Sequence, residues 1–324
     1  MENKYNVLII GAGKISAFFD KPSLSTIITH SHAFTKNNGF RLLGFLDIDC
    51  NKAKLASEIW GGQYFNSLKD AFRKNQIDVV VIAVPDEYHY NVLKEVLEYE
   101  PKIIFLEKPV TKTIKQADEI LEIINRKTTE IVVNYSRRFV NEYELIKNEI
   151  LTGVYGKFST GTCYYGKGVL HNGSHAVDLI RFLLSDIKDK YVTASILDYY
   201  KDDPSVTAEL ILENGKKFYL QAIDCNNYTI FGMDLLFEKG RIRFEDSDYL
   251  KIEKFSVKEN KIFNGYKNLV KTYDYRNEND TAIESAVKNI YNYLVIGEKL
   301  KCTFKDGYEV LKVCLELQGK GITN

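Results

Sequence analysis

Short apolar runs that end at a glycine, aspartate, proline or glutamate limit the fold of the N-terminal sequence more than any other feature. Such runs occupy residues 6–10, 40–46, 79–84 and 103–106. Because they are nearly continuous in apolar residues rather than alternating, they predict strands buried on both faces, as in a parallel sheet. Helical patterns, such as that of residues 90–99, separate the runs. Strands alternating with helices predict a doubly wound α/β sheet with right-handed crossovers.

The pattern changes after about residue 155. Residues 205–212 and 217–223 alternate apolar and polar side chains, which is typical of half-buried strands in a mainly antiparallel sheet. Between them, the pair Asn214-Gly215 predicts a tight hairpin. Lys239-Gly240 predicts a second hairpin, before an alternating segment at residues 241–245.

The length of 324 residues suits two domains better than one core. We expect a doubly wound domain at residues 1–125 and a second, α+β domain at residues 126–324. Helical patterns at residues 281–300 and 308–318 close the second domain.

Charge and cysteine content narrow the class of protein. Lys plus Arg and Asp plus Glu are each 44, so the formal net charge is zero, which gives no reason to expect a nucleic-acid or membrane partner. The five cysteines are scattered and include no C-x-x-C pair. This favours a reducing compartment over a disulfide framework, and no long apolar run indicates a signal or membrane segment. We therefore expect a cytoplasmic protein.

A glycine-rich segment follows the first apolar run directly and opens a helix in our prediction. Gly11 permits the tight turn, and Gly13 allows close approach of a pyrophosphate to the backbone. The helix is expected to begin at Lys14 and Ile15. Free N–H groups at a helix N-terminus attract a phosphate group. Ser16 replaces the small third residue of the fingerprint. The alternative is a purely structural turn.

Asp47 ends the second apolar run, where a carboxylate can accept hydrogen bonds from the adenosine ribose. It lies further from the glycine loop than is usual, so residues 18–32 predict an extension near the cofactor. The following residues, Ile48 and Asp49, supply no cation for a 2′-phosphate. This favours NAD over NADP. A solvated aspartate at a strand end is the alternative.

Lys108 follows the fourth apolar run between Glu107 and Pro109. Ligands of open α/β sheets bind outside the carboxyl ends of the strands, so Lys108 is expected at the crevice. An ammonium group there can stabilise a developing alkoxide and relay a proton. The Lys108–Pro109 peptide is also a candidate for the cis form. A surface Lys in a Glu-Lys pair is the alternative interpretation.

Two histidines precede an apolar helical segment at residues 179–184. His175 lies one helical turn before Asp178, and His171 one turn before His175. A histidine is a natural general base for an alcohol proton. A histidine that caps or packs the helix start is the alternative. We do not expect a metal, since the sequence shows no HExxH motif and no evident third ligand.

The motifs together resemble the Gfo/Idh/MocA oxidoreductase family over nearly the whole chain. Besides the glycine loop, residues 84–89 are similar to its TPNxxH segment, residues 107–109 to its EKP signature, and residues 133–139 to its xxNxRRF strand. The resemblance implies a Rossmann domain and a second domain with a large open sheet, often used for oligomer contacts. It also implies that Pro85, His89 and Glu107 lie beside the cofactor.

By the same resemblance, Lys108 and His175 form the catalytic pair, acting on a ring carbinol of a sugar, nucleotide sugar or inositol. The family often has an aspartate four residues before its catalytic histidine, where this chain has His171. His171, Asn172 and Tyr165 are predicted to contact the substrate, together with Lys108 and His175. A homo-oligomer, dimer or tetramer, is expected.

Our mechanistic hypothesis places NAD across the strand ends, with its nicotinamide at a crevice between the domains. His175 takes the hydroxyl proton while Lys108 steadies the oxygen and a hydride leaves the carbinol carbon. One alternative is a non-catalytic NAD-binding sensor or partner-binding module. Another is a keto-sugar reductase that uses Tyr165 as its proton donor.

Overall fold

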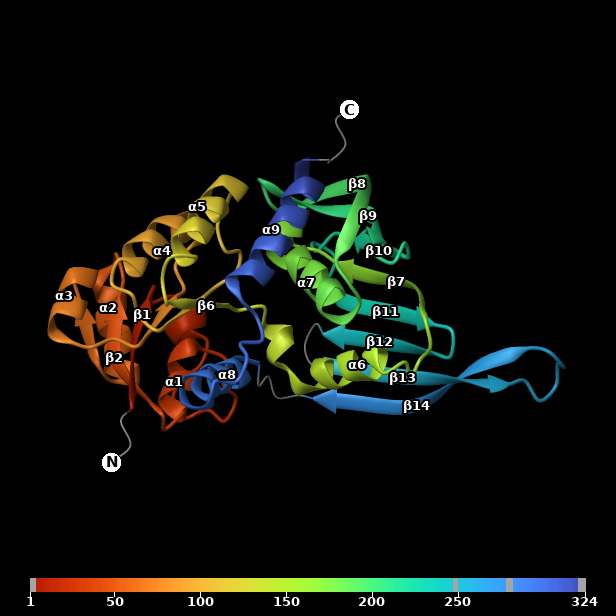
Figure 1. Cartoon of the computed structure of the whole chain (residues 1–324), viewed down its shortest axis with the longest axis horizontal. Coiled ribbons are helices and arrows are strands. Elements are labelled where there is room, and N and C mark those ends of the chain that lie inside the picture. Colours follow the sequence, from red (N-terminus) through yellow and green to blue (C-terminus); the bar gives the residue numbers. More distant parts are fainter. Residues whose placement is uncertain (1–3, 247–249, 278–281, 320–324) are drawn as a thin grey trace. The chain divides into compact units, whose positions relative to one another are not determined.

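The computed structural model describes residues 4–246, 250–277 and 282–319, and this part of the chain forms two compact units (Figure 1). The first unit contains the described residues up to Val140 together with residues 282–311. The second contains those from Asn141 to 277 and residues 312–319. This division differs from the predicted boundary at residue 125. The physical reason is that one more strand joins the first sheet after that point, and the chain later returns to the first unit.

The first unit is built on a six-stranded sheet with the order β3-β2-β1-β4-β5-β6. All neighbouring strands are parallel, which confirms the predicted doubly wound sheet. The short edge strand β3 was not predicted from the sequence. The strands are β1 (Tyr5–Ile10), β2 (Phe40–Leu46), β3 (Gln63–Phe65), β4 (Val79–Ile82), β5 (Ile103–Leu106) and β6 (Glu130–Val133).

Helices and single turns connect these strands. The segment after the glycine loop is a π-helical turn of five residues, η1 (Lys14–Phe18), and the first α-helix begins only at His30. The prediction that the loop opens a helix is confirmed for this single turn, because the extension predicted at residues 18–32 follows it directly. The remaining elements are α1 (His30–Lys36), α2 (Cys50–Trp60), α3 (Leu68–Lys74), η2 (Asp86–Tyr88), α4 (His89–Leu97), α5 (Ile114–Ile124), η3 (Ser136–Phe139) and α8 (Ala282–Ile296).

The second unit contains an eight-stranded sheet with the order β14-β13-β12-β11-β7-β10-β9-β8. Among its neighbouring pairs, β7 and β10 are parallel and the others antiparallel. Both predicted hairpins are confirmed, between β9 and β10 and between β11 and β12. The strands are β7 (Phe158–Tyr165), β8 (Ile187–Tyr200), β9 (Asp203–Leu212), β10 (Lys217–Ala222), β11 (Phe231–Phe237), β12 (Gly240–Asp246), β13 (Leu250–Glu259) and β14 (Lys267–Asn277).

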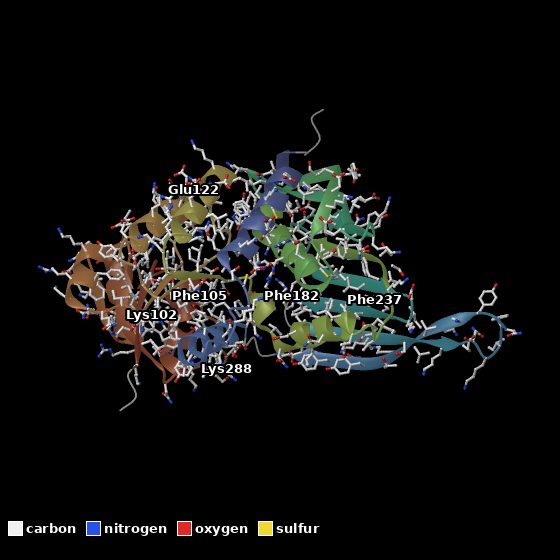
Figure 2. The ribbon with its side chains drawn as sticks, viewed as in Figure 1. Lys102, Phe105, Glu122, Phe182, Phe237 and Lys288 are labelled. Atoms are coloured by element: carbon white, nitrogen blue, oxygen red, sulfur yellow. The ribbon has the colours of Figure 1, made fainter. Side chains whose placement is uncertain are left out.

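Two helices pack against this sheet, α6 (Asn141–Leu151) and α7 (Ser174–Leu183), and Figure 1 shows both lying over its strands. Tyr143 of α6 contacts Phe244 of β12, with ring centroids 5.2 Å apart. Gly173, the residue before α7, lies against the ring of Tyr165 on β7. The two helices also meet each other, since the Lys147 ammonium lies 4.2 Å from the ring centroid of Phe182. Figure 2 labels Phe182 on α7.

Several helix bounds differ from the predictions. The helix expected at residues 179–184 begins earlier, at Ser174. The helix expected at residues 281–300 ends at Ile296, before Gly297 with its positive φ of 70°, and residue 281 lies outside the described residues. The last helix, α9 (Phe304–Gly319), begins before the predicted 308. Within the described ranges, none of the helices is long and apolar enough to cross a membrane.

We predict that Phe105→Ala lowers the free energy of unfolding of the first unit by about 3–5 kcal/mol. Phe105 lies on β5 with no exposed surface, in edge-on contact with His30 at 4.9 Å between ring centroids (Figure 2). Urea denaturation followed by circular dichroism measures the effect. The matched control is Leu55→Ala on α2, where the side chain is 49% exposed, and we expect a change within about 0.5 kcal/mol. Equal effects of the two substitutions would contradict the packing described here.

Candidate active site

The loop after β1 bends sharply because Gly11 has a positive φ of 92°. A Cβ at this position would lie 2.7 Å from the Ala83 carbonyl carbon, closer than real carbon contacts allow. Only glycine therefore permits the loop to cross so closely over the end of β4. The loop is also tied down by Ser16, whose hydroxyl donates to the Gly11 carbonyl.

Asp47 at the end of β2 binds the same loop. Its Oδ2 accepts a hydrogen bond of 2.6 Å from the Ala12 N–H, and its Oδ1 accepts one of 2.8 Å from Asp49. The structure thus brings the predicted ribose-binding carboxylate to the glycine loop, although 35 residues separate Asp47 from Ala12. The adjacent Ile48 is 99% exposed.

Gly13 differs from Gly11 because nothing in the chain itself crowds it. A Cβ on Gly13 would have no neighbour closer than Ser16 Oγ at 3.9 Å. The missing side chain leaves one side of the loop open beside the N–H groups of Lys14 and Ile15. Such an open cradle is what the approach of a pyrophosphate requires. The loop and Asp47 therefore fit a dinucleotide.

This difference gives a paired prediction. Gly13→Ala should leave the stability of the chain nearly unchanged but weaken NADH binding at least ten-fold, because the methyl group occupies the open side of the loop. Gly11→Ala should instead destabilise the fold, because its methyl group meets the backbone of β4. Thermal unfolding and isothermal titration with NADH distinguish the two effects. Unchanged NADH affinity in a folded Gly13→Ala variant would contradict the cradle.

His89 is buried at the carboxyl edge of the sheet and joins two loops there. Its Nδ1 lies 2.6 Å from the Pro109 carbonyl and its Nε2 lies 3.0 Å from the Val84 carbonyl. The ring therefore holds the segment before Pro85 against the segment after Lys108. A direct contact of Pro85 or His89 with the cofactor stays a prediction, and the contacts seen here give His89 a positioning role.

Glu107 lies in a buried polar cluster that sequence analysis did not find. Its Oε1 accepts a hydrogen bond of 2.7 Å from the Asn134 amide and lies 2.8 Å from His30 Nε2. Burial alone would raise the pKa of Glu107. The hydrogen bonds with His30 and Asn134 and the neighbouring charge of Lys108 outweigh burial, so the pKa of Glu107 lies below its ordinary value. The carboxylate stays charged next to Lys108.

Lys108 itself is half-buried and follows β5 at the carboxyl edge of the sheet. The Lys108–Pro109 peptide is cis, as predicted. The last strand of this sheet leads to η3, where Arg138 is buried and donates to Asp306 Oδ1 at 2.8 Å. The loop after β1 and Lys108 therefore share one edge of the first unit, as the parallel strands require.

In the second unit, a turn of unusual construction carries the predicted histidines. This turn is the π-helical η4 (Gly168–Gly173), which leads directly into α7. Two buried carboxylates from the β8–β9 hairpin hold it. Asp198 Oδ2 accepts from the Lys167 N–H at 2.7 Å, and Asp203 Oδ1 accepts from the Leu170 N–H at 2.9 Å. Gly168 has a φ of 79°, and a Cβ there would overlap the Asp203 carboxylate.

Asp198 is stabilised in its charged form despite its burial. Burial alone would raise the pKa of Asp198, but hydrogen bonds from the Lys167 N–H and the Ser205 hydroxyl lower it below its ordinary value. Ser205 extends the network, since its Oγ also accepts from the Gly168 N–H at 2.8 Å. The turn is thus fixed at several backbone positions.

His171 projects from this turn and is held on two sides. Its Nδ1 lies 2.7 Å from Asp203 Oδ2, and its ring stacks on Tyr200 at 3.7 Å between centroids and 15° between planes. The side chain remains 27% exposed, whereas that of Asp203 is 2% exposed. Asp203 was not identified from the sequence, because 32 residues separate it from His171.

The other predicted residues of this region lie close by in the chain. His175 is half-buried in the first turn of α7, and Asp178 is buried one turn further on. Asn172 donates to the Gly166 carbonyl at 3.0 Å, which closes the turn between β7 and η4. The predicted substrate contacts of His175 and Asn172 stay predictions.

The structure does not support the predictions that Tyr165 donates a proton or contacts the substrate. Its side chain has no exposed surface, and its hydroxyl donates to the Val206 carbonyl and accepts from the Val206 N–H, both at 2.8 Å. Burial raises its pKa well above the ordinary value. Tyr164 is 43% exposed and points to the opposite face of the sheet, since successive side chains of a strand alternate.

We predict that Tyr165→Phe retains catalytic turnover within about two-fold of the wild type. The free energy of unfolding should fall by about 1–3 kcal/mol, because the substitution leaves the buried groups of Val206 without a partner. Steady-state kinetics and urea denaturation measure the two quantities. A loss of turnover beyond about 100-fold in a stably folded variant would return Tyr165 to the reacting atoms.

No group of three or more histidine, cysteine, aspartate or glutamate side chains that could hold a metal occurs in the part of the chain that the structure describes.

The first unit has the sheet order, glycine loop and edge residues of a dinucleotide-binding oxidoreductase.

Comparison with known proteins agrees with that class. Residues 5–135 match the model of the Gfo/Idh/MocA family, described as an oxidoreductase family with an NAD-binding Rossmann fold. Inositol 2-dehydrogenase of Corynebacterium glutamicum is 26% identical over 267 residues, covering 75% of this chain and 74% of the relative. The N-terminal part of the chain, residues 5–135, is therefore similar to the NAD-binding Rossmann domain of the Gfo/Idh/MocA oxidoreductases.

Solved structures show the same fold over the whole chain. The WlbA dehydrogenase from Bordetella pertussis, in complex with NADH and UDP-GlcNAcA, has a TM-score of 0.77 at 16% identity and covers 99% of this chain and 98% of its own. A variant of KijD10, a 3-ketoreductase from Actinomadura kijaniata in complex with TDP-benzene and NADP, has a TM-score of 0.77 at 12% identity, with coverages of 99% and 98%.

Proposed function

We propose that the chain is an NAD-dependent dehydrogenase that oxidises a ring carbinol of a sugar, nucleotide sugar or inositol. The observation that carries the proposal is the arrangement at one edge of the first sheet. There, the open loop at Gly13 and the bound carboxylate of Asp47 share the carboxyl edge with Lys108. The family and its inositol 2-dehydrogenase relatives support a reaction at a CH–OH group.

NAD is preferred over NADP because of the charge at the end of β2. A 2′-phosphate bound to the adenosine ribose would lie near the carboxylates of Asp47 and Asp49, and the residue between them is the apolar, exposed Ile48. Repulsion between like charges disfavours that ligand. Solved relatives hold NADH in one case and NADP in another, so a comparison of the two affinities tests the preference.

In the proposed reaction, NAD held by the glycine loop and Asp47 would supply the acceptor for a hydride from the carbinol carbon. Lys108 donates a hydrogen bond to the carbinol oxygen and stabilises the negative charge that develops there. Glu107, kept charged by its cluster, lies next to Lys108 in the chain. A histidine of the second unit accepts the hydroxyl proton, and the resemblance to the family assigns this role to His175.

Two further expectations accompany the proposal. We propose a cytoplasmic location, since the described cysteines are free and a reducing compartment keeps them so. We propose a homo-oligomer on the resemblance to the family. The sugar or polyol substrate is proposed from the relatives, because the chain's own residues fix the reacting group and not the rest of the molecule.

We predict that Lys108→Ala lowers kcat by about 10²–10⁴-fold and changes NADH affinity less than three-fold, because the ammonium acts on the reacting oxygen rather than on the cofactor. Steady-state oxidation of myo-inositol and UDP-sugars with NAD measures kcat. Isothermal titration measures NADH affinity.

The matched control for this variant is Lys112→Ala, which removes an exposed lysine four residues away and should leave both quantities unchanged. Turnover like that of the wild type in Lys108→Ala would overturn the assignment. Tight NADH binding by a wild-type protein that oxidises and reduces none of the compounds would support a sensor instead.

A further inference from the structure

The pair formed by His171 and Asp203 has the construction of a positioned general base. We propose that Asp203 fixes the orientation and tautomer of His171, and that His171, rather than His175, accepts the hydroxyl proton at Nε2. The inference rests on the proposed function for its chemistry. The orientation of His171 by Asp203 involves the chain alone and does not depend on the reaction.

The tautomer follows from the donors around Asp203. Its Oδ1 accepts from the Leu170 N–H at 2.9 Å and its Oδ2 from the His171 N–H at 3.0 Å. Because both oxygens act as acceptors for backbone donors, the carboxyl group is the acceptor toward the imidazole as well. His171 Nδ1 therefore donates its proton to Asp203 Oδ2 across 2.7 Å.

A proton on Nδ1 gives the other nitrogen the lone pair. Nε2 is then the atom at which His171 can exchange a proton with a substrate. The buried carboxylate also stabilises the imidazolium that forms when this exchange occurs.

The ring has little freedom to turn away from this orientation. Tyr200 stacks against its face at 3.7 Å, and the turn that carries it is anchored through Asp198 as well as Asp203. The ring nevertheless keeps 27% of its side-chain surface exposed. A buried carboxylate, a fixed ring and a partly exposed side chain are three features that favour proton exchange with a bound alcohol.

The O–H bond of the carbinol breaks and its proton moves to His171 Nε2. The electron pair of the carbinol C–H bond leaves with the hydride, the oxidation that bound NAD supplies in the proposed function, and a carbonyl group remains. His175 then has the role of a substrate contact one helical turn along.

Three isosteric variants test the assignment: His171→Gln, His175→Gln and Asp203→Asn. Gln at 171 keeps an uncharged polar group near the position of Nε2 and leaves the backbone hydrogen bonds of the turn intact, but it accepts no proton at neutral pH. We expect His171→Gln to lower kcat for myo-inositol or UDP-sugar oxidation by about 10²–10³-fold with KM changed less than five-fold. We expect His175→Gln to lower kcat less than ten-fold.

Nitrogen-15 NMR of histidine-labelled protein supplies a readout that needs no turnover. The chain has only five histidines, so single substitutions assign their imidazole signals. We expect His171 to show the Nδ1–H tautomer in the wild type. In Asp203→Asn, the amide can donate to Nδ1, which moves the proton to Nε2 and should lower kcat without changing NADH affinity.

The outcomes test the catalytic role of His171 separately from the positioning role of Asp203. A severe loss in His175→Gln with a mild loss in His171→Gln overturns the inference and returns the role to His175. An Nε2–H tautomer of wild-type His171, or one unaffected by Asp203→Asn, overturns the role of Asp203. A wild-type protein that binds NADH but oxidises no compound contradicts the proposed function and the catalytic role of His171, while the tautomer result still decides the role of Asp203.

Discussion

The close approach of the β1 loop to the end of β4 is the constraint on which the proposed cofactor site depends. Gly11 makes the approach possible, because any side chain there would overlap the Ala83 backbone. The loop in turn places the Ala12 N–H where Asp47 can bind it. The parallel order of the strands then puts Lys108 at the same edge. The turn at Gly11 and the strand order thus bring Gly11 and Lys108, which lie 97 positions apart in the sequence, to one edge of the sheet.

In each unit, a carboxylate that is largely removed from water is stabilised by several hydrogen bonds. Glu107 is surrounded by His30 and Asn134, and Asp203 by backbone N–H groups and His171. Each carboxylate is paired through several hydrogen bonds, which offsets the cost of removing it from water. Each also adjoins a side chain with a proposed chemical role, Lys108 in one case and His171 in the other. The same hydrogen-bonded carboxylate therefore stabilises each unit and positions a residue with a proposed chemical role.

Much of the first unit could be predicted from the sequence, because uniform apolar runs and a glycine loop are local signals. The partners of Glu107 and His171 could not. His30 and Asn134 lie 77 and 27 residues from Glu107, and only the fold brings them together. Tyr165 was misjudged although its strand gave a clue: it alternates with Tyr164 and shares the inward face with Cys163. The single turn after the glycine loop shows that an inserted segment can shorten a regular element that a motif implies.

The central claim is that this chain transfers a hydride from a carbinol to NAD. The most direct test is to incubate the protein with NAD and with inositols and UDP-sugars that carry deuterium on the ring carbinol carbons, and to measure deuterium in the NADH by mass spectrometry. The account predicts singly deuterated NADH from at least one compound, formed only when the wild-type protein is present. Tight NADH binding without deuterium transfer from any compound would contradict it.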